Sequence, residues 1–208
     1  KKEKMKSKTY YQLILDASGS MSNVRSETLN AVNNQILSIR SLAERMPGQE
    51  MVVSLVLFNT EVTTLYSHLG PEQAPLLTSR QYVPEGSTAL LDAIGMRIMD
   101  TERLLSPEDD VVIVVLTDGE ENASQFFTYK QIAEKISNRK RTERWSFSFV
   151  GADIDAWSIA CRLNIDREEV RSVSKSHLAS AMQEMNVTLN DYMEHKRRGM
   201  RKTGFFKN

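Results

Sequence analysis

The sequence lacks most of the features that mark secreted, membrane-spanning or nucleotide-binding proteins. Cys161 is the single cysteine among 208 residues, so no disulfide can form within the chain, and a reducing compartment such as the cytoplasm is expected. No apolar run reaches 18 residues, and no apolar signal-peptide core precedes the first expected strand. Neither G-x-G-x-x-G nor G-x-x-x-x-G-K-[ST] occurs, which argues against dinucleotide binding and against an ATPase within this chain.

Histidines are also few. His68, His177 and His195 are scattered, without metal-ligand spacing and without an evident nucleophile partner, so surface or capping roles are expected. Because no histidine or lysine is recognisably placed as a general base, the sequence favours a non-enzymatic protein. The enzymatic alternative is a metal-dependent phosphatase or hydrolase that uses a bound ion as a Lewis acid.

What the chain does have is the composition of one ordinary globular domain, with 40% apolar and 26% charged residues. Its net charge of zero hides a pattern, because residues 1–8 carry five Lys and one Glu, and residues 196–208 carry six basic residues and no acid. We therefore divide the chain into a basic lead (1–8), one domain (9–195) and a basic tail (196–208). Solvated ends are expected, and nucleic acid is not the favoured partner.

Apolar periodicity predicts strands that alternate with helices. The expected strands are 10–16, 51–58, 61–66, 111–116, 145–150 and 170–173, and the expected helices are 23–46, 88–105, 129–140, 154–163 and 178–197. Asn59-Thr60 is so short a link that the third strand must run antiparallel to the second, and Ser176 is the expected N-cap of the last helix. The fold class is therefore α/β: a doubly wound, mostly parallel six-stranded sheet with one antiparallel edge strand and helices on both faces.

Oxygen-bearing side chains follow the ends of two of these strands. Asp16, Ser18 and Ser20 come directly after the first strand in the run DASGSM, and Asp118 follows the fourth. In a doubly wound sheet of order 3-2-1-4-5-6 those strands are neighbours, and ligands bind outside their carboxyl ends. Thr88, expected at the start of the preceding helix, approaches the same place. DASGSM alone is equally typical of a simple turn.

Two carboxylates and three hydroxyls form an oxygen-only set that suits a hard cation. Mg²⁺ is favoured, with Mn²⁺ or Ca²⁺ possible. If the hydroxyls bind directly and the carboxylates act mostly through water, the ion keeps much of its positive charge. An open coordination position would then attract an Asp or Glu carboxylate from a partner protein.

Together these residues resemble the metal-ion-dependent adhesion site of von Willebrand factor type A (vWA) domains. In that family the Ser and Thr residues bind the ion directly, the Asp residues bind directly or through water, and a partner's acid often completes the shell. By resemblance, the metal ligands here are Asp16, Ser18, Ser20, Thr88 and Asp118.

The resemblance covers roughly residues 9–195, and the segments 86–93 (GSTALLDA) and 117–122 (TDGEEN) look like the bacterial stand-alone members. It implies an adaptor or scaffold that docks a protein partner through bridged Mg²⁺. The single cysteine and the lack of a long apolar run add the expectation that it is cytoplasmic and not bound to a membrane. The alternative that the resemblance leaves open is an adaptor subunit of an ATPase-driven chelatase or remodelling machine, with the ATPase on a separate chain.

Four neighbouring or isolated residues complete the expectations. Gly19 allows either a close backbone approach or a positive φ. Glu120 and Glu121 either tune the ion or belong to a solvated loop. Cys161 is expected to be a buried structural thiol, since Ala160 and Leu163 flank it on an apolar helix.

Overall fold

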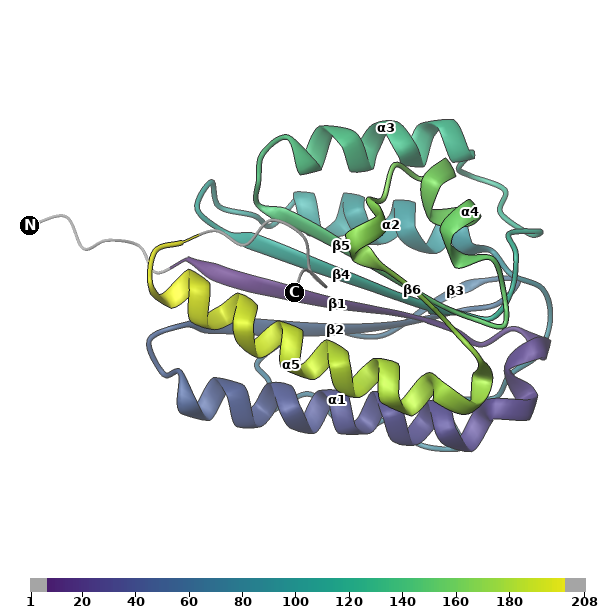
Figure 1. Ribbon diagram of the computed structural model, residues 1–208, viewed down its shortest axis with the longest axis horizontal. Helices are drawn as coiled ribbons and strands as arrows, with labels where there is room; N and C mark the ends of the chain where they lie inside the picture. Colours follow the sequence, from purple (N-terminus) through teal and green to yellow (C-terminus); the bar gives the residue numbers. More distant parts are fainter. Residues whose placement is uncertain (1–6, 201–208) are drawn as a thin grey trace, which may run out of the picture.

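The computed structural model describes residues 7–200, which form one six-stranded sheet (Figure 1). Its strands are β1 (Lys8–Asp16), β2 (Glu50–Phe58), β3 (Val62–Leu69), β4 (Asp110–Thr117), β5 (Trp145–Ala152) and β6 (Val170–Val173). The order is β3-β2-β1-β4-β5-β6, and every pairing is parallel except that of β2 with β3. The doubly wound fold class is thereby confirmed.

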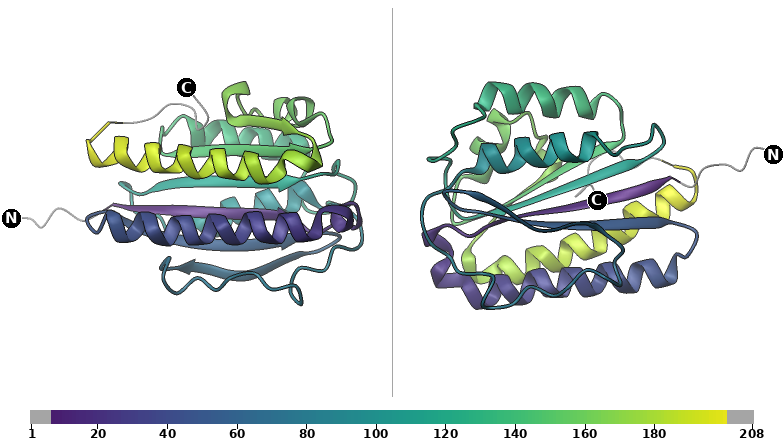
Figure 2. Two further views of the ribbon diagram at one scale, coloured as in Figure 1. Left: turned by 60° about the horizontal axis from the view of Figure 1, so that its bottom comes forward. Right: turned by 180° about the vertical axis from the view of Figure 1, so that it is seen from behind.

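Helices cover both faces of the sheet. They are α1 (Arg25–Arg45), α2 (Leu90–Glu102), α3 (Tyr129–Lys140), α4 (Ala156–Arg162) and α5 (Leu178–Arg197). The helices α1 and α5 lie side by side on one face, and α2, α3 and α4 lie on the other (Figures 1 and 2). Within residues 7–200, no helix is long and apolar enough to span a membrane.

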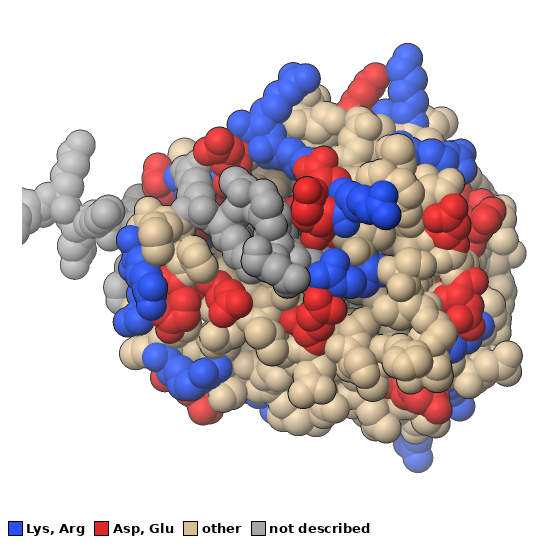
Figure 3. Space-filling model, in the orientation of Figure 1, with Lys and Arg blue, Asp and Glu red and all other residues tan. Residues whose placement is uncertain are grey.

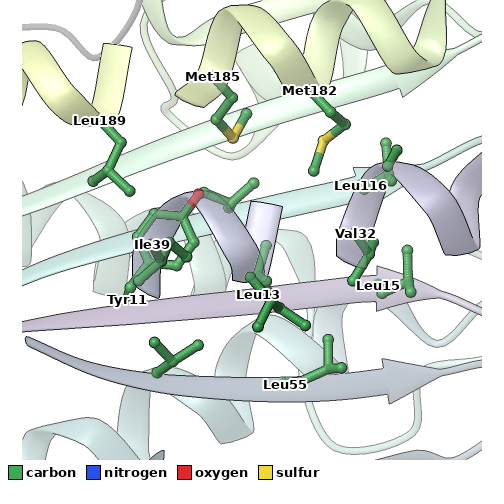
Figure 4. Packing of buried hydrophobic residues seen from close by; sticks show 14 of the residues in the cluster. Tyr11, Leu13, Leu15, Val32, Ile39, Leu55, Leu116, Met182, Met185 and Leu189 are labelled. Carbon is green, nitrogen blue, oxygen red and sulfur yellow. The ribbon is translucent and has the colours of Figure 1, made fainter. Parts of the chain in front are cut away.

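The two faces bury separate apolar clusters because strand side chains alternate between them. On the α1/α5 side, Tyr11, Leu13 and Leu15 of β1 face Val32 and Ile39 of α1, with Met182, Met185 and Leu189 of α5 closing the layer (Figure 4). On the other side, Ile113 and Val115 of β4 pack against α2, α3 and α4. All eight residues of β4 are buried, as expected of a central parallel strand.

Element boundaries differ from the sequence-based expectations where turns intervene. A 3₁₀ turn (Gly19–Val24) precedes α1, and α2 begins at Leu90 rather than at Thr88. The expectation for Ser176 is wrong, because a 3₁₀ turn occupies Lys175–His177 and the N-cap position of α5 is His177, without a side-chain cap. The basic tail lies mostly outside the described residues, and α5 runs to Arg197.

Residues 70–89, between β3 and α2, contain no helix or strand, yet side chains of α1 hold them in place. Arg25 Nε donates to the Tyr82 carbonyl at 2.9 Å, and Asn33 exchanges two hydrogen bonds with the Leu77 backbone, at 2.9 and 2.8 Å. The Tyr82 hydroxyl in turn donates to the Asp16 carbonyl at 2.8 Å. This long segment therefore reaches the end of β1 in a fixed position.

Candidate metal centre

Asp16 anchors the centre at the carboxyl edge of the sheet. The parallel register pairs Leu15 with Leu116, so Asp16 and Thr117 lie next to one another at the ends of β1 and β4. The Asp16 carboxylate is fully buried, accepts a hydrogen bond from the Ser18 backbone N–H at 2.7 Å and a second from the Thr117 hydroxyl. These two donors fix its orientation without neutralising its charge.

A chain of hydrogen bonds joins the first loop to the fourth strand. The Ser18 and Ser20 hydroxyl oxygens lie 3.1 Å apart, and Ser20 Oγ donates to Asp118 Oδ1 at 2.6 Å. Ser18 is buried and Ser20 is exposed, so the pair connects the interior with the surface. Residues nearly one hundred positions apart are thus brought into direct contact.

Thr88 reaches the same place from the third loop. A Cβ atom placed on Gly119 would lie 3.0 Å from Thr88 Oγ1 and 3.7 Å from Asp16 Oδ2, so the Thr88 hydroxyl lies against the backbone that follows Asp118. Thr88 is 3% exposed. All five residues of the predicted set therefore lie in three loops that meet at one edge of the sheet.

Backbone contacts hold two of these loops together. Gly19 N–H donates to the Gly86 carbonyl at 3.1 Å, and Glu85 N–H donates to the Ala17 carbonyl at 2.9 Å. Gly86, not Gly19, has the positive φ, at 73°. A side chain on Gly86 would also come within 2.6 Å of Thr60 Oγ1, so this position requires glycine on both counts.

Electrostatically the centre carries two buried carboxylates and one cation. Burial raises the pKa of Asp16, and the nearby Asp118 adds to that rise, while the hydrogen bonds from Thr117 and Ser18 oppose it. The Asp118 side chain is completely inaccessible, and its countercharge is Lys175, whose Nζ lies 2.8 Å from Oδ2. Two carboxylates are buried here, and only one ammonium group balances them. The excess negative charge favours the binding of a further cation.

The donor set fits a hard divalent ion in kind. Within residues 7–200 no group of three or more His, Cys, Asp or Glu side chains could hold a metal, so any ion here depends on hydroxyl oxygens as well. Three hydroxyls and two carboxylates are oxygen ligands of the type that Mg²⁺ and Mn²⁺ accept. The five predicted residues supply oxygens of this kind, and both the ligand set and its occupancy stay predictions.

Two residues that position the centre were not singled out from the sequence. Thr117 donates to Asp16, and its hydroxyl also accepts from the Gly119 N–H at 3.1 Å. Asn122 Oδ1 accepts from the Thr88 N–H at 2.8 Å, and Asn122 N–H donates back to the Thr88 carbonyl at 3.0 Å. Both residues lie in the segment 117–122 (TDGEEN), which also contains Asp118. Their closeness to Asp118 in the sequence was the signal that could have identified them.

Glu121 lies in a partly exposed loop, and it also has a structural role that the sequence did not indicate. Its carboxylate accepts hydrogen bonds from the backbone N–H groups of Leu91, Ala123 and Ser124, at 2.9, 2.9 and 2.7 Å. It therefore accepts from a backbone N–H in the first turn of α2 that has no partner within the helix. It also stabilises the loop that follows Glu121. Glu120 is exposed.

Cys161 is exposed, so the expectation of a buried thiol is wrong. Its neighbours Ala160 and Leu163 are fully buried, and the short α4 turns Cys161 outward between them. Among the histidines, His68 is partly buried, and burial lowers its pKa. His177 is exposed and contacts Ser174, as expected for a residue at a helix start.

The sequence matches no protein-family model and no curated protein, whereas the fold matches many solved structures. The vWF domain of the type V pili tip protein Mfa5 from Porphyromonas gingivalis is similar with a TM-score of 0.66 and 12% identity. That match covers 90% of this chain and 96% of the other. A von Willebrand factor type A structure from Catenulispora acidiphila gives a TM-score of 0.54 and 17% identity over 88% of this chain and 42% of that one.

A third similar structure is proximal thread matrix protein 1 from the mussel byssus, described with a zinc-occupied MIDAS motif. It gives a TM-score of 0.58 and 17% identity, covering 89% of this chain and 46% of that protein. The present chain thus spans less than half the length of the mussel and Catenulispora chains. At these identities the comparisons establish the fold alone, which is that of the vWA domains.

Proposed function

We propose that this chain, which has the vWA fold, is a non-enzymatic protein-binding module that docks a partner's carboxylate through a bridged divalent ion, with Mg²⁺ favoured. The carrying observation is the convergence of two buried carboxylates and three hydroxyls from three separate loops. The ligands in this proposal are Asp16, Ser18, Ser20, Thr88 and Asp118.

The chemistry of the set supports docking over hydrolysis. Hydroxyl ligands leave most of the positive charge on the ion, and that charge attracts an anionic oxygen from outside. Asp16 and Asp118 are both engaged in hydrogen bonds, and no histidine contacts either of them among the described residues. Lys175, which contacts Asp118, is held in an ion pair with it. These contacts favour binding over proton transfer.

A protein is the favoured partner. The similar structures include a pilus tip protein and a byssus matrix protein, whose settings involve protein assemblies. On the face seen in Figure 3, Lys and Arg side chains are interspersed with Asp and Glu side chains rather than gathered in one basic field. A phosphate backbone would favour such a field, so nucleic acid is not proposed.

A cytoplasmic location is proposed from the single cysteine. If the module serves an ATPase, that ATPase is a separate chain.

Isothermal calorimetry with Mg²⁺ and Mn²⁺ tests the ion site. Thr88→Ala and Asp16→Ala should each weaken binding by at least about tenfold, since each removes an oxygen donor from a small set. Thr142→Ala, at the opposite edge of the sheet where β5 begins, is the matched control and should bind as wild type. Equal uptake by all four folded proteins would refute the proposed ligand set.

Partner docking requires a separate measurement. Protein captured by the immobilised chain should be released by a chelator and should be absent from Thr88→Ala but not from Thr142→Ala. Capture that survives both the chelator and Thr88→Ala would mean that the partner binds elsewhere.

A further inference from the structure

Lys175 lies in the candidate metal centre, although it comes from a part of the chain that contributes none of the predicted ligands. It follows β6, which is separated from β4 by β5 in the sheet. Its Nζ lies 2.8 Å from Asp118 Oδ2 and 3.4 Å from the Ser20 carbonyl oxygen. The ammonium group therefore contacts both the fourth-strand carboxylate and the loop that carries the serines.

The ion pair is protected from solvent on the carboxylate side. The Asp118 side chain has no accessible surface, and the Lys175 side chain is 25% exposed. Asp118 Oδ1 is already occupied by the Ser20 hydroxyl at 2.6 Å, so Lys175 takes the remaining oxygen. Asp118 Oδ1 thus has a hydrogen bond, whereas Oδ2 has the ion pair with Lys175 and no hydrogen-bond partner.

The backbone of Lys175 is fixed independently of that ion pair. Its N–H donates to Asp153 Oδ1 at 3.1 Å, and Asp153 N–H donates to the Val173 carbonyl at 2.8 Å. The Ser174 hydroxyl lies 2.6 Å from His177 Nδ1. The contacts of Asp153 hold the Lys175 backbone beside the end of β5, so a displacement of the ammonium group would involve the side chain alone.

We propose that Lys175 is a tethered cation that competes with the divalent ion for Asp118, so that its ammonium occupies the centre without the ion and withdraws when the ion binds. The inference rests on the proposed function, since it concerns the same ion. It assigns to Lys175 the lowering of ion affinity by competition, whereas the five predicted ligands raise that affinity.

The competition follows from charge. An ammonium and a divalent ion that share one carboxylate in a partly buried site repel one another strongly, because the local dielectric is well below that of water. The ion must therefore displace Lys175 or bind more weakly beside it. In both cases the lysine lowers the affinity, and a neutral unbranched side chain of similar length removes that cost.

Calorimetric titration with Mn²⁺ and Mg²⁺ tests this in the full chain. Lys175→Met should bind either ion about tenfold more tightly than wild type, and Lys175→Arg, which keeps the charge, should not gain affinity. Lys130→Met removes the same charge from an exposed position on α3 and should leave the affinity unchanged. Equal affinity in Lys175→Met and wild type, with both binding, would refute the tethered cation and leave the proposed function intact.

A second readout follows the amine itself. Residue-resolved acetylation should modify Lys175 slowly in chelator and faster in saturating Mg²⁺, with Lys130 reacting at one rate throughout. An unchanged rate at Lys175 while calorimetry reports bound ion would also overturn the inference. If neither wild type nor Lys175→Met takes up an ion, the proposed function fails and the inference falls with it.

Discussion

At the scale of single residues, the buried carboxylates differ in what stabilises their charge. Asp16 receives hydrogen bonds from Ser18 and Thr117, and Asp118 is paired with Lys175. Glu169, just before β6, is 5% exposed, and one of its oxygens has no hydrogen-bond partner. Glu169 therefore has the least compensation for the loss of water.

Glu169 should make stability depend on pH. Burial raises its pKa to about 7 from 4.5, with Asp166 and Glu168 adding to the rise and Lys140 and the Phe147 backbone opposing it. Since the folded state binds the proton more tightly than the unfolded state, this group lowers the free energy of unfolding as pH rises from about 4.5 to about 7. Above pH 7 the contribution of Glu169 to the free energy of unfolding no longer changes with pH.

Glu169→Gln removes that titration. At pH 8 the variant should exceed wild type in free energy of unfolding, by an amount on the order of 2 kcal/mol, and at pH 5 the difference should be small. Urea unfolding at the two pH values is the measurement. Glu134→Gln, at an exposed position on α3, serves as the control. A difference between Glu169→Gln and wild type that is the same at both pH values would contradict this reading of Glu169.

At the scale of elements, the loop after β4 is built onto the first turns of α2. The Asp92 carboxylate accepts from the backbone N–H groups of Gln125, Phe126 and Phe127, at 2.7, 3.0 and 2.9 Å. Phe127 then packs over Gly95, where an added Cβ would come within 2.5 Å of its ring. The loop that carries Asp118 is therefore held at both ends, and Thr88 is held to its middle by Asn122.

Asn122→Ala tests whether that link positions Thr88. The variant keeps all five proposed ligands but leaves the Thr88 N–H without its acceptor, so Mg²⁺ affinity should fall by about tenfold while the fold is retained. Calorimetry gives the affinity, and circular dichroism checks the fold. Asn138→Ala, at an exposed position on α3, is the matched control. Unaltered affinity in Asn122→Ala would show that Thr88 needs no such support.

At the scale of the whole molecule, ion binding should stabilise the fold, because the proposed ligands are brought together only when the sheet is formed. At a concentration one hundred times the dissociation constant, an ion that binds only the folded state adds about 2.7 kcal/mol. For a chain of this size that corresponds to a rise in Tm of about 5 to 10 °C. Thermal unfolding in Mg²⁺ and in chelator gives the shift, which Thr88→Ala should reduce to about half or less. A shift of equal size in both proteins would indicate binding outside the proposed centre.

The architecture was accessible from the sequence because it depends on repeated patterns. Alternating strands and helices indicate a parallel sheet, and the short link between Phe58 and Val62 indicates the antiparallel edge. The neighbouring ends of β1 and β4 follow from that order, which is why Asp16 and Asp118 could be expected to approach one another. Ion binding at this place remains a prediction.

What could not be predicted depends on local geometry without a periodic signal. Cys161 and Ala160 are adjacent in sequence, and only the rotation of a seven-residue helix decides which is buried. The start of α5 at Leu178 is as expected, but the 3₁₀ turn at Lys175–His177 makes His177 and not Ser176 its N-cap. Lys175 reaches Asp118 across the width of a strand, and no sequence spacing encodes that contact.

The position of Lys175 in the chain has a consequence for biosynthesis. A ribosome completes every proposed ligand, the last being Asp118, well before residue 175 leaves the exit tunnel. During that interval the carboxylates of Asp16 and Asp118 can bind free cations without competition from Lys175, provided that the first four strands have already paired. The ion would then bind before Lys175 is available to pair with Asp118.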